Sequence, residues 1–121
     1  MQYMLLVYVD EQAMNDAERE QCYVDSAKLT QDLAEQGKFV TASPLHPVAT
    51  ATSVRVREGK PVVTDGPFAE TREQLGGFYI VEADDLDDAL AIAARIPPAT
   101  KGTIEVSPVM QISGLPEPAN A

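Results

Sequence analysis

The first strand-like segment of the chain is apolar on both of its faces. Residues Gln2–Val9 (QYMLLVYV) are rich in the branched and aromatic side chains that favour β-strands. Alternate side chains of a strand point to opposite faces, which produces two apolar sets: Met4, Leu6 and Tyr8 on one face, and Leu5, Val7 and Val9 on the other. Phe78–Glu82 (FYIVE) repeats this pattern. Both segments therefore need cover on two sides.

Helical and strand patterns alternate along the chain in a recognisable order. In the first half, the sequence predicts a strand at Gln2–Val9, a helix from Asn15 or Asp16 to about Gln36, and a strand at Lys38–Ala42. A hairpin of Ser53–Arg57 and Pro61–Thr64 follows, and then a loop at Asp65–Gly77 with one helical turn after Pro67. The last elements are a strand at Phe78–Glu82, a helix capped by Asp84 or Asp85 and ended by Pro97-Pro98, and a strand at Thr103–Ser107. The second helix should bury a stripe of Leu86, Ala89, Leu90, Ala93 and Ile96. This order predicts an α+β, ferredoxin-like split βαβ fold with an added β-hairpin over residues 1–112, followed by a loose tail at 113–121.

Two helices cannot cover both faces of such a sheet, because in this topology they pack on the same side. Burying one large apolar side chain is worth roughly 1.5–3 kcal/mol, so a row of them left in water is unfavourable. We therefore expect a homodimer with facing sheets, a dimeric α+β barrel that encloses a small cavity. The alternative is that the hairpin and the tail fold over the exposed face.

Composition excludes several classes of protein. The 121 residues suit one domain, and a net charge of -10 argues against nucleic acid and against anionic membrane surfaces. The single cysteine, Cys22, and the single histidine, His46, exclude an intramolecular disulfide and a multi-histidine metal site. The longest apolar run, Met4–Val9, is too short to span a bilayer and no leader precedes it, so we expect a cytoplasmic protein. No glycine-rich phosphate-binding signature occurs, and we expect no cofactor.

Two residues are candidates for acid–base chemistry. Asp65 opens a DGP turn, where its carboxylate either acts as an acid or base beside an apolar wall or accepts hydrogen bonds from the backbone of the turn. His46 lies in a proline-containing loop, and its ordinary pKa of about 6.5 suits a proton shuttle, although a lone loop histidine is more often solvated.

A second group of residues is predicted to bind a ligand. Arg57, which shares a strand face with Arg55, can hold a carboxylate or phosphate, or it can pair with acids on the surface. The full set of predicted ligand-binding residues is Tyr8, Arg57, Asp65, Phe68, Glu73 and Tyr79.

Several stretches resemble a known family. YMLLVYVDE (Tyr3–Glu11), ATSVRVREGK (Ala51–Lys60), VTDGPFAETREQLGGFYIVEADDLDDAL (Val63–Leu90) and IEVSPV (Ile104–Val109) are similar to the YCII-related proteins, specifically the branch named for its DGPF motif. The resemblance covers nearly the whole chain and implies a ferredoxin-like, dimeric α+β barrel. It also implies a link to sigma factors, which some relatives are fused to or encoded beside. The His–Asp pair proposed as the active site of the broader group would fall at Ser26 and Ile96, so that pair is not carried over.

Three functions are consistent with these patterns. The first is binding of a small organic ligand in a dimer cavity, in a protein accessory to sigma-factor-linked transcription control. The second is a cofactor-free lyase or isomerase with Asp65 as general acid or base. The third is a structural dimerisation module.

Overall fold

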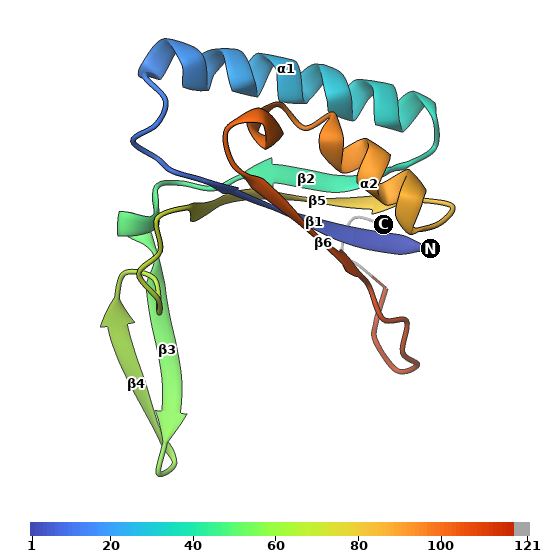
Figure 1. Ribbon diagram of the computed structural model, residues 1–121. Coiled ribbons are helices and arrows are strands. Elements are labelled where there is room, and N and C mark those ends of the chain that lie inside the picture. The colour runs from blue at the N-terminus through green and yellow to red at the C-terminus, as the bar shows by residue number, and fades with distance from the viewer. Residues whose placement is uncertain (118–121) are drawn as a thin grey trace.

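The computed structural model, which describes residues 1–117, has a four-stranded antiparallel sheet with two helices on one of its faces (Figure 1). The sheet runs in the order β2-β5-β1-β6, with bounds β1 Gln2–Val9, β2 Phe39–Pro44, β5 Gln74–Glu82 and β6 Thr103–Pro108. The helices are α1 (Asp16–Glu35) and α2 (Leu86–Ala94), and two short 3-10 segments occupy Val48–Thr50 (η1) and Pro97–Thr100 (η2). This arrangement of two interleaved βαβ units confirms the α+β prediction and is consistent with a ferredoxin-like fold.

The core lies between the helices and one face of the sheet. Leu5 of β1 is opposite Tyr79 of β5 and Val106 of β6, so these three side chains share the face that the helices cover. Leu5 is completely buried, as is Leu33 of α1. The alternation predicted for β1 and β5 is confirmed, because Tyr3, Leu5, Val7, Tyr79 and Val81 are all buried.

Both helices begin at the capping residues that the sequence indicates. The Asn15 side chain accepts a hydrogen bond from the Glu18 backbone N–H, and the Glu18 carboxylate accepts one from the Asn15 N–H. Asp85 caps α2 through the backbone N–H of Asp88.

The buried stripe of α2 differs from the prediction. Ala89, Ala93 and Ile96 are buried as expected, but Leu86 and Leu90 are exposed and Ile92 takes their place in the core. The helix is rotated slightly relative to the predicted stripe, so its small alanines, rather than its leucines, meet the sheet.

Two strand boundaries and one predicted helical turn also differ. β5 begins at Gln74 rather than Phe78, because it stays paired with β1 along its full length through a bulge at Val7/Tyr8. No helical turn follows Pro67. β2 continues to Pro44, which is tolerated because β2 is an edge strand.

The other face of the sheet has no helical cover. It carries Met4, Leu6 and Tyr8 of β1, together with Phe78 and Ile80 of β5, which lie opposite Leu6 and Met4. A separate hairpin, β3 (Thr52–Arg57) paired with β4 (Lys60–Asp65), projects from this side of the sheet as an arm (Figure 1). The arm does not fold over its own sheet. Of the helices in residues 1–117, none has the length and apolar character needed to cross a membrane.

Candidate ligand-binding cavity

A cavity of about 560 Å³ lies between α1 and the sheet, within the range typical of small-molecule sites. One wall is the inner surface of α1, and the opposite wall is formed by β5 and the end of β2 with the loop that follows it. Most of the lining is apolar, and the polar side chains that reach it include Arg19, Ser26, Thr30, His46 and Tyr79. An apolar chamber with a few polar groups is the usual composition of a site for a small organic molecule.

Two consecutive glycines of β5 shape one wall of the cavity. A Cβ atom added to Gly77 would lie 2.9 Å from the carbonyl oxygen of Ser43, so only glycine allows the end of β2 to come this close. The backbone N–H of Leu45 donates to the Gly76 carbonyl at 2.9 Å. This close approach brings the loop that carries His46 to the cavity wall.

The buried polar group of the cavity is the Tyr79 hydroxyl. Tyr79 is buried in β5, and its side chain is hydrogen bonded to Ser26 of α1. Burial raises the pKa of Tyr79 above its ordinary value, while the hydrogen bond with Ser26 acts in the opposite direction. The phenol is therefore neutral at physiological pH and is able to donate a hydrogen bond.

Cys22 and Met14 bring two sulfur atoms to the cavity lining. Burial, followed by the nearby Asp25 carboxylate, raises the pKa of the Cys22 thiol. The Cys22 Sγ atom lies 3.7 Å from the Met14 Sδ atom. Cys22 is consequently a protonated, packed thiol rather than an activated nucleophile.

The charged residues at the cavity edge hold the surrounding loops. Arg19 donates to the Asp16 carboxylate at 3.1 Å and to the Glu11 carbonyl at 3.0 Å. The Glu11 carboxylate in turn accepts a hydrogen bond from the Val48 N–H at 3.1 Å. These contacts connect the β1–α1 loop with η1, so the charged side chains of Arg19 and Glu11 serve mainly to hold these two segments together.

Within the part of the chain that the structure describes, no group of three or more His, Cys, Asp or Glu side chains is placed to hold a metal ion. No buried side-chain nitrogen or oxygen in this part of the chain lacks a hydrogen-bond partner.

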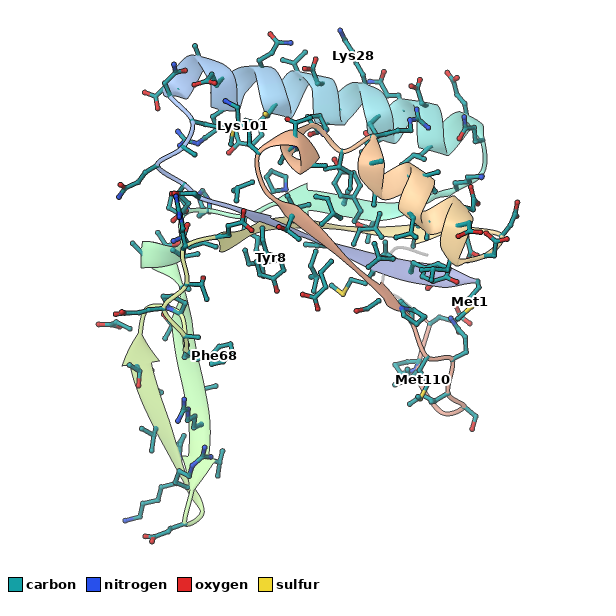
Figure 2. All side chains as sticks on the ribbon, viewed as in Figure 1. Met1, Tyr8, Lys28, Phe68, Lys101 and Met110 are labelled. Carbon is teal, nitrogen blue, oxygen red and sulfur yellow. The ribbon has the colours of Figure 1, made fainter. Side chains whose placement is uncertain are left out.

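The predicted site residues do not gather at one place in a single chain. His46 and Tyr79 line the cavity. Tyr8 lies on the opposite, helix-free side of the sheet (Figure 2). Glu73, just before β5, accepts a hydrogen bond from the Thr103 hydroxyl at 2.8 Å.

The remaining predicted residues belong to the arm and its base. Arg57 ends β3 beside the tip of the arm, and Asp65 ends β4, where its side chain is exposed. Phe68 follows at the base of the arm and is 78% exposed (Figure 2). The Asp65 side chain is therefore open to solvent and lies outside the cavity. Its turn is held instead by the Gly66 N–H, which donates to the Ala51 carbonyl at 2.7 Å.

Sequence reasoning missed most of the cavity. Ser26, Thr30 and Ala42 are small residues on one helix and one strand, and no local pattern distinguishes them. The Gly76-Gly77 pair is a usable signal, because glycine inside a strand often marks a close approach of another backbone.

Comparison with known proteins supports the resemblance noted in the sequence. A family model described as the YCII-related domain matches residues 1–113. An uncharacterized protein of Rhizobium meliloti is 37% identical over 114 residues, which cover 90% of this chain and 92% of that protein. The two positions at which the resemblance would place a His–Asp pair, Ser26 and Ile96, both line the cavity.

Proposed function

Because this chain belongs to the YCII-related family, we propose that it binds a small, mainly apolar organic molecule in the cavity between α1 and the sheet. The presence of the DGPF motif at Asp65–Phe68 supports its placement in the branch named for that motif. The observation that carries the proposal is the cavity itself, whose volume and lining suit such a ligand.

The residues at two cavity positions favour binding over catalysis. The family resemblance would place an acid–base pair at Ser26 and Ile96, and this chain has a hydroxyl and an aliphatic group there. Neither group exchanges a proton readily near neutral pH. At these two positions the cavity thus offers a hydrogen bond and an apolar contact rather than a proton-transfer pair.

The polar groups of the cavity suggest the chemistry of the ligand. The neutral Tyr79 phenol and the Ser26 hydroxyl lie together on the inner walls, whereas His46 lies on the more exposed loop. A ring or short aliphatic body with one hydroxyl, carbonyl or carboxylate would fill the apolar space and meet these groups.

Titration with indole and benzoate, followed by two-dimensional NMR of the backbone amides, tests the proposal. Binding should shift amides on both walls, such as those of Ala27, Thr30 and Gly77. Ser26→Trp should fill the cavity and weaken binding at least tenfold. Gln31→Trp is the matched control, because Gln31 is an exposed residue of the same helix that does not line the cavity.

The assay also separates this site from the helix-free sheet face. Shifts confined to β1 and β5 residues of that face, unchanged in a folded Ser26→Trp protein, would refute binding in the cavity. Absence of shifts at millimolar indole and benzoate would refute it for small aromatic ligands of this class.

A further inference from the structure

Two hydroxyl groups of the cavity lining already donate to backbone carbonyls. The Thr30 hydroxyl donates to the Ala27 carbonyl of α1 at 2.7 Å, and the Ser43 hydroxyl donates to the Pro44 carbonyl at 2.9 Å. Each hydroxyl carries a single proton, so neither side chain has one left for a ligand. A donor for a ligand must therefore come from elsewhere in the lining.

The positive charge at the cavity edge is also paired. Arg19 is the only arginine or lysine among the described residues that line the cavity, and its guanidinium donates to the Asp16 carboxylate at 3.1 Å. The same side chain donates to the Glu11 carbonyl at 3.0 Å, and the Glu11 side chain adds a negative charge to the lining. Within residues 1–117, the cavity thus presents an anion with no unpaired arginine or lysine.

The hydroxyls of Tyr79 and Ser26 remain as donors on the inner walls. Tyr79 of β5 is only 6% exposed, and its phenol is hydrogen bonded to Ser26 of α1. The bond with Ser26 lowers the pKa of Tyr79 against the larger effect of burial, so the serine hydroxyl donates to the phenol oxygen. The proton of the neutral phenol is then free to bind an acceptor on a ligand.

We infer that the cavity selects an uncharged ligand that carries one hydrogen-bond acceptor, such as the carbonyl of a ketone, ester or amide. The Tyr79 phenol donates to this acceptor, and the apolar lining encloses the rest of the molecule. The inference rests on the proposed function and narrows it: of the polar groups that the cavity can meet, it favours a carbonyl over a carboxylate.

Two physical effects disfavour a carboxylate in this cavity. Moving an ionised carboxylate out of water is costly unless a charge of opposite sign replaces the lost hydration, and Arg19 is already paired with Asp16. The chain also has a net charge of -10, so its overall field repels an anion. A carbonyl loses much less hydration on entering, and a single donor is enough to compensate for it.

Titration with acetophenone and benzoate compares two ligands of nearly the same size, one with a neutral carbonyl and one with a carboxylate. At neutral pH, with binding followed by the amide shifts of Ala27, Thr30 and Gly77, acetophenone should bind at least tenfold more tightly. Tyr79→Phe should weaken acetophenone binding about fivefold, because it removes the donor and keeps the ring. Tyr3→Phe is the matched control, since Tyr3 is 5% exposed on the same face of the sheet but does not line the cavity.

The outcomes separate this inference from the proposed function. Benzoate binding in the cavity as tightly as acetophenone, whether or not His46→Gln weakens it, would overturn the preference for an uncharged ligand and leave ligand binding intact. Unchanged acetophenone binding in a folded Tyr79→Phe protein would overturn the role of the phenol. Absence of cavity shifts with acetophenone, benzoate and indole alike would overturn the proposed function and the inference with it.

Discussion

The Lys38 ammonium lies 2.9 Å from both carboxylate oxygens of Asp88, and this pair joins the start of β2 to the first turn of α2. Asp88 also accepts a hydrogen bond from the Asp84 N–H at 2.9 Å. The hydrogen bond with Lys38, followed by that from Asp84, lowers the pKa of Asp88, and the bond with Asp88 raises the pKa of Lys38. The pair connects the two βαβ units on the helical side of the sheet.

This pair predicts a specific pH dependence of stability. A carboxyl group with a lowered pKa stabilises the fold above its unfolded value of about 3.8, and the effect is lost as pH falls through the folded pKa. A lysine with a raised pKa stabilises the fold below about 10.5, and the effect is lost as pH rises through the folded pKa. Asp88→Asn should therefore lower the Tm at pH 7, and the difference from wild type should shrink below about pH 4.

Thermal unfolding between pH 2.5 and 9 measures this effect. Asp87→Asn is the control, since it makes the same charge change in the same helical turn at an exposed residue. Equal pH profiles for the two variants would contradict a stabilising role of the ion pair.

The Tyr79–Ser26 contact predicts how the phenol titrates. Because the bond with Ser26 opposes the effect of burial, Ser26→Ala should raise the pKa of Tyr79 further. A group with a raised pKa stabilises the fold below its unfolded value, here about 10.0, and that stability is lost as pH rises through the folded pKa. Tyr79→Phe should remove this alkaline loss. Tyrosinate absorbance against pH measures the shift, and a lower Tyr79 pKa in Ser26→Ala would refute the contact.

Gly77 predicts a steric effect on the cavity wall. In Gly77→Ala the new methyl group would meet backbone atoms, the Ser43 oxygen at 2.9 Å and the Pro44 Cα at 3.2 Å. We expect destabilisation of about 1–3 kcal/mol, measured by urea unfolding. Gly76→Ala is the comparison: its methyl group would lie 3.2 Å from the Val9 side chain, which can adjust, so its effect should be smaller. A larger destabilisation in Gly76→Ala than in Gly77→Ala would contradict the steric role of Gly77.

The capping box predicts the stability of the start of α1. Asn15→Ala removes the acceptor for the Glu18 N–H, and it should destabilise the protein by about 1 kcal/mol in chemical denaturation. Asn15→Asp keeps an acceptor at the same position and should retain wild-type stability. If Asn15→Ala did not change the free energy of unfolding, water would have to satisfy the Glu18 N–H as well as the Asn15 side chain does.

The features of the fold that depend on contacts within a single helix or strand could be predicted from the sequence. Asn15 and Asp85 cap helices because a side-chain oxygen meets nearby backbone N–H groups, and that contact depends on only four residues. The α2 stripe was predicted less well, because Leu86 and Leu90 satisfy the helical period but the neighbouring sheet selects Ile92 instead. The cavity was not predictable, since Ser26, Gly77 and Pro44 meet only when three elements pack together.

The sequence alone determined that β1 and β5 are apolar on both faces and that the elements follow a split βαβ order, because alternation and capping are properties of short segments. It did not determine which face the helices cover. Both faces of β1 and β5 have similar apolar patterns, so the alternation does not choose between them, and only the packing of the whole structure places Leu5 and Tyr79 beneath the helices. Tertiary structure therefore decided that Met4, Leu6 and Tyr8 face away from the helices, on the same side as the arm.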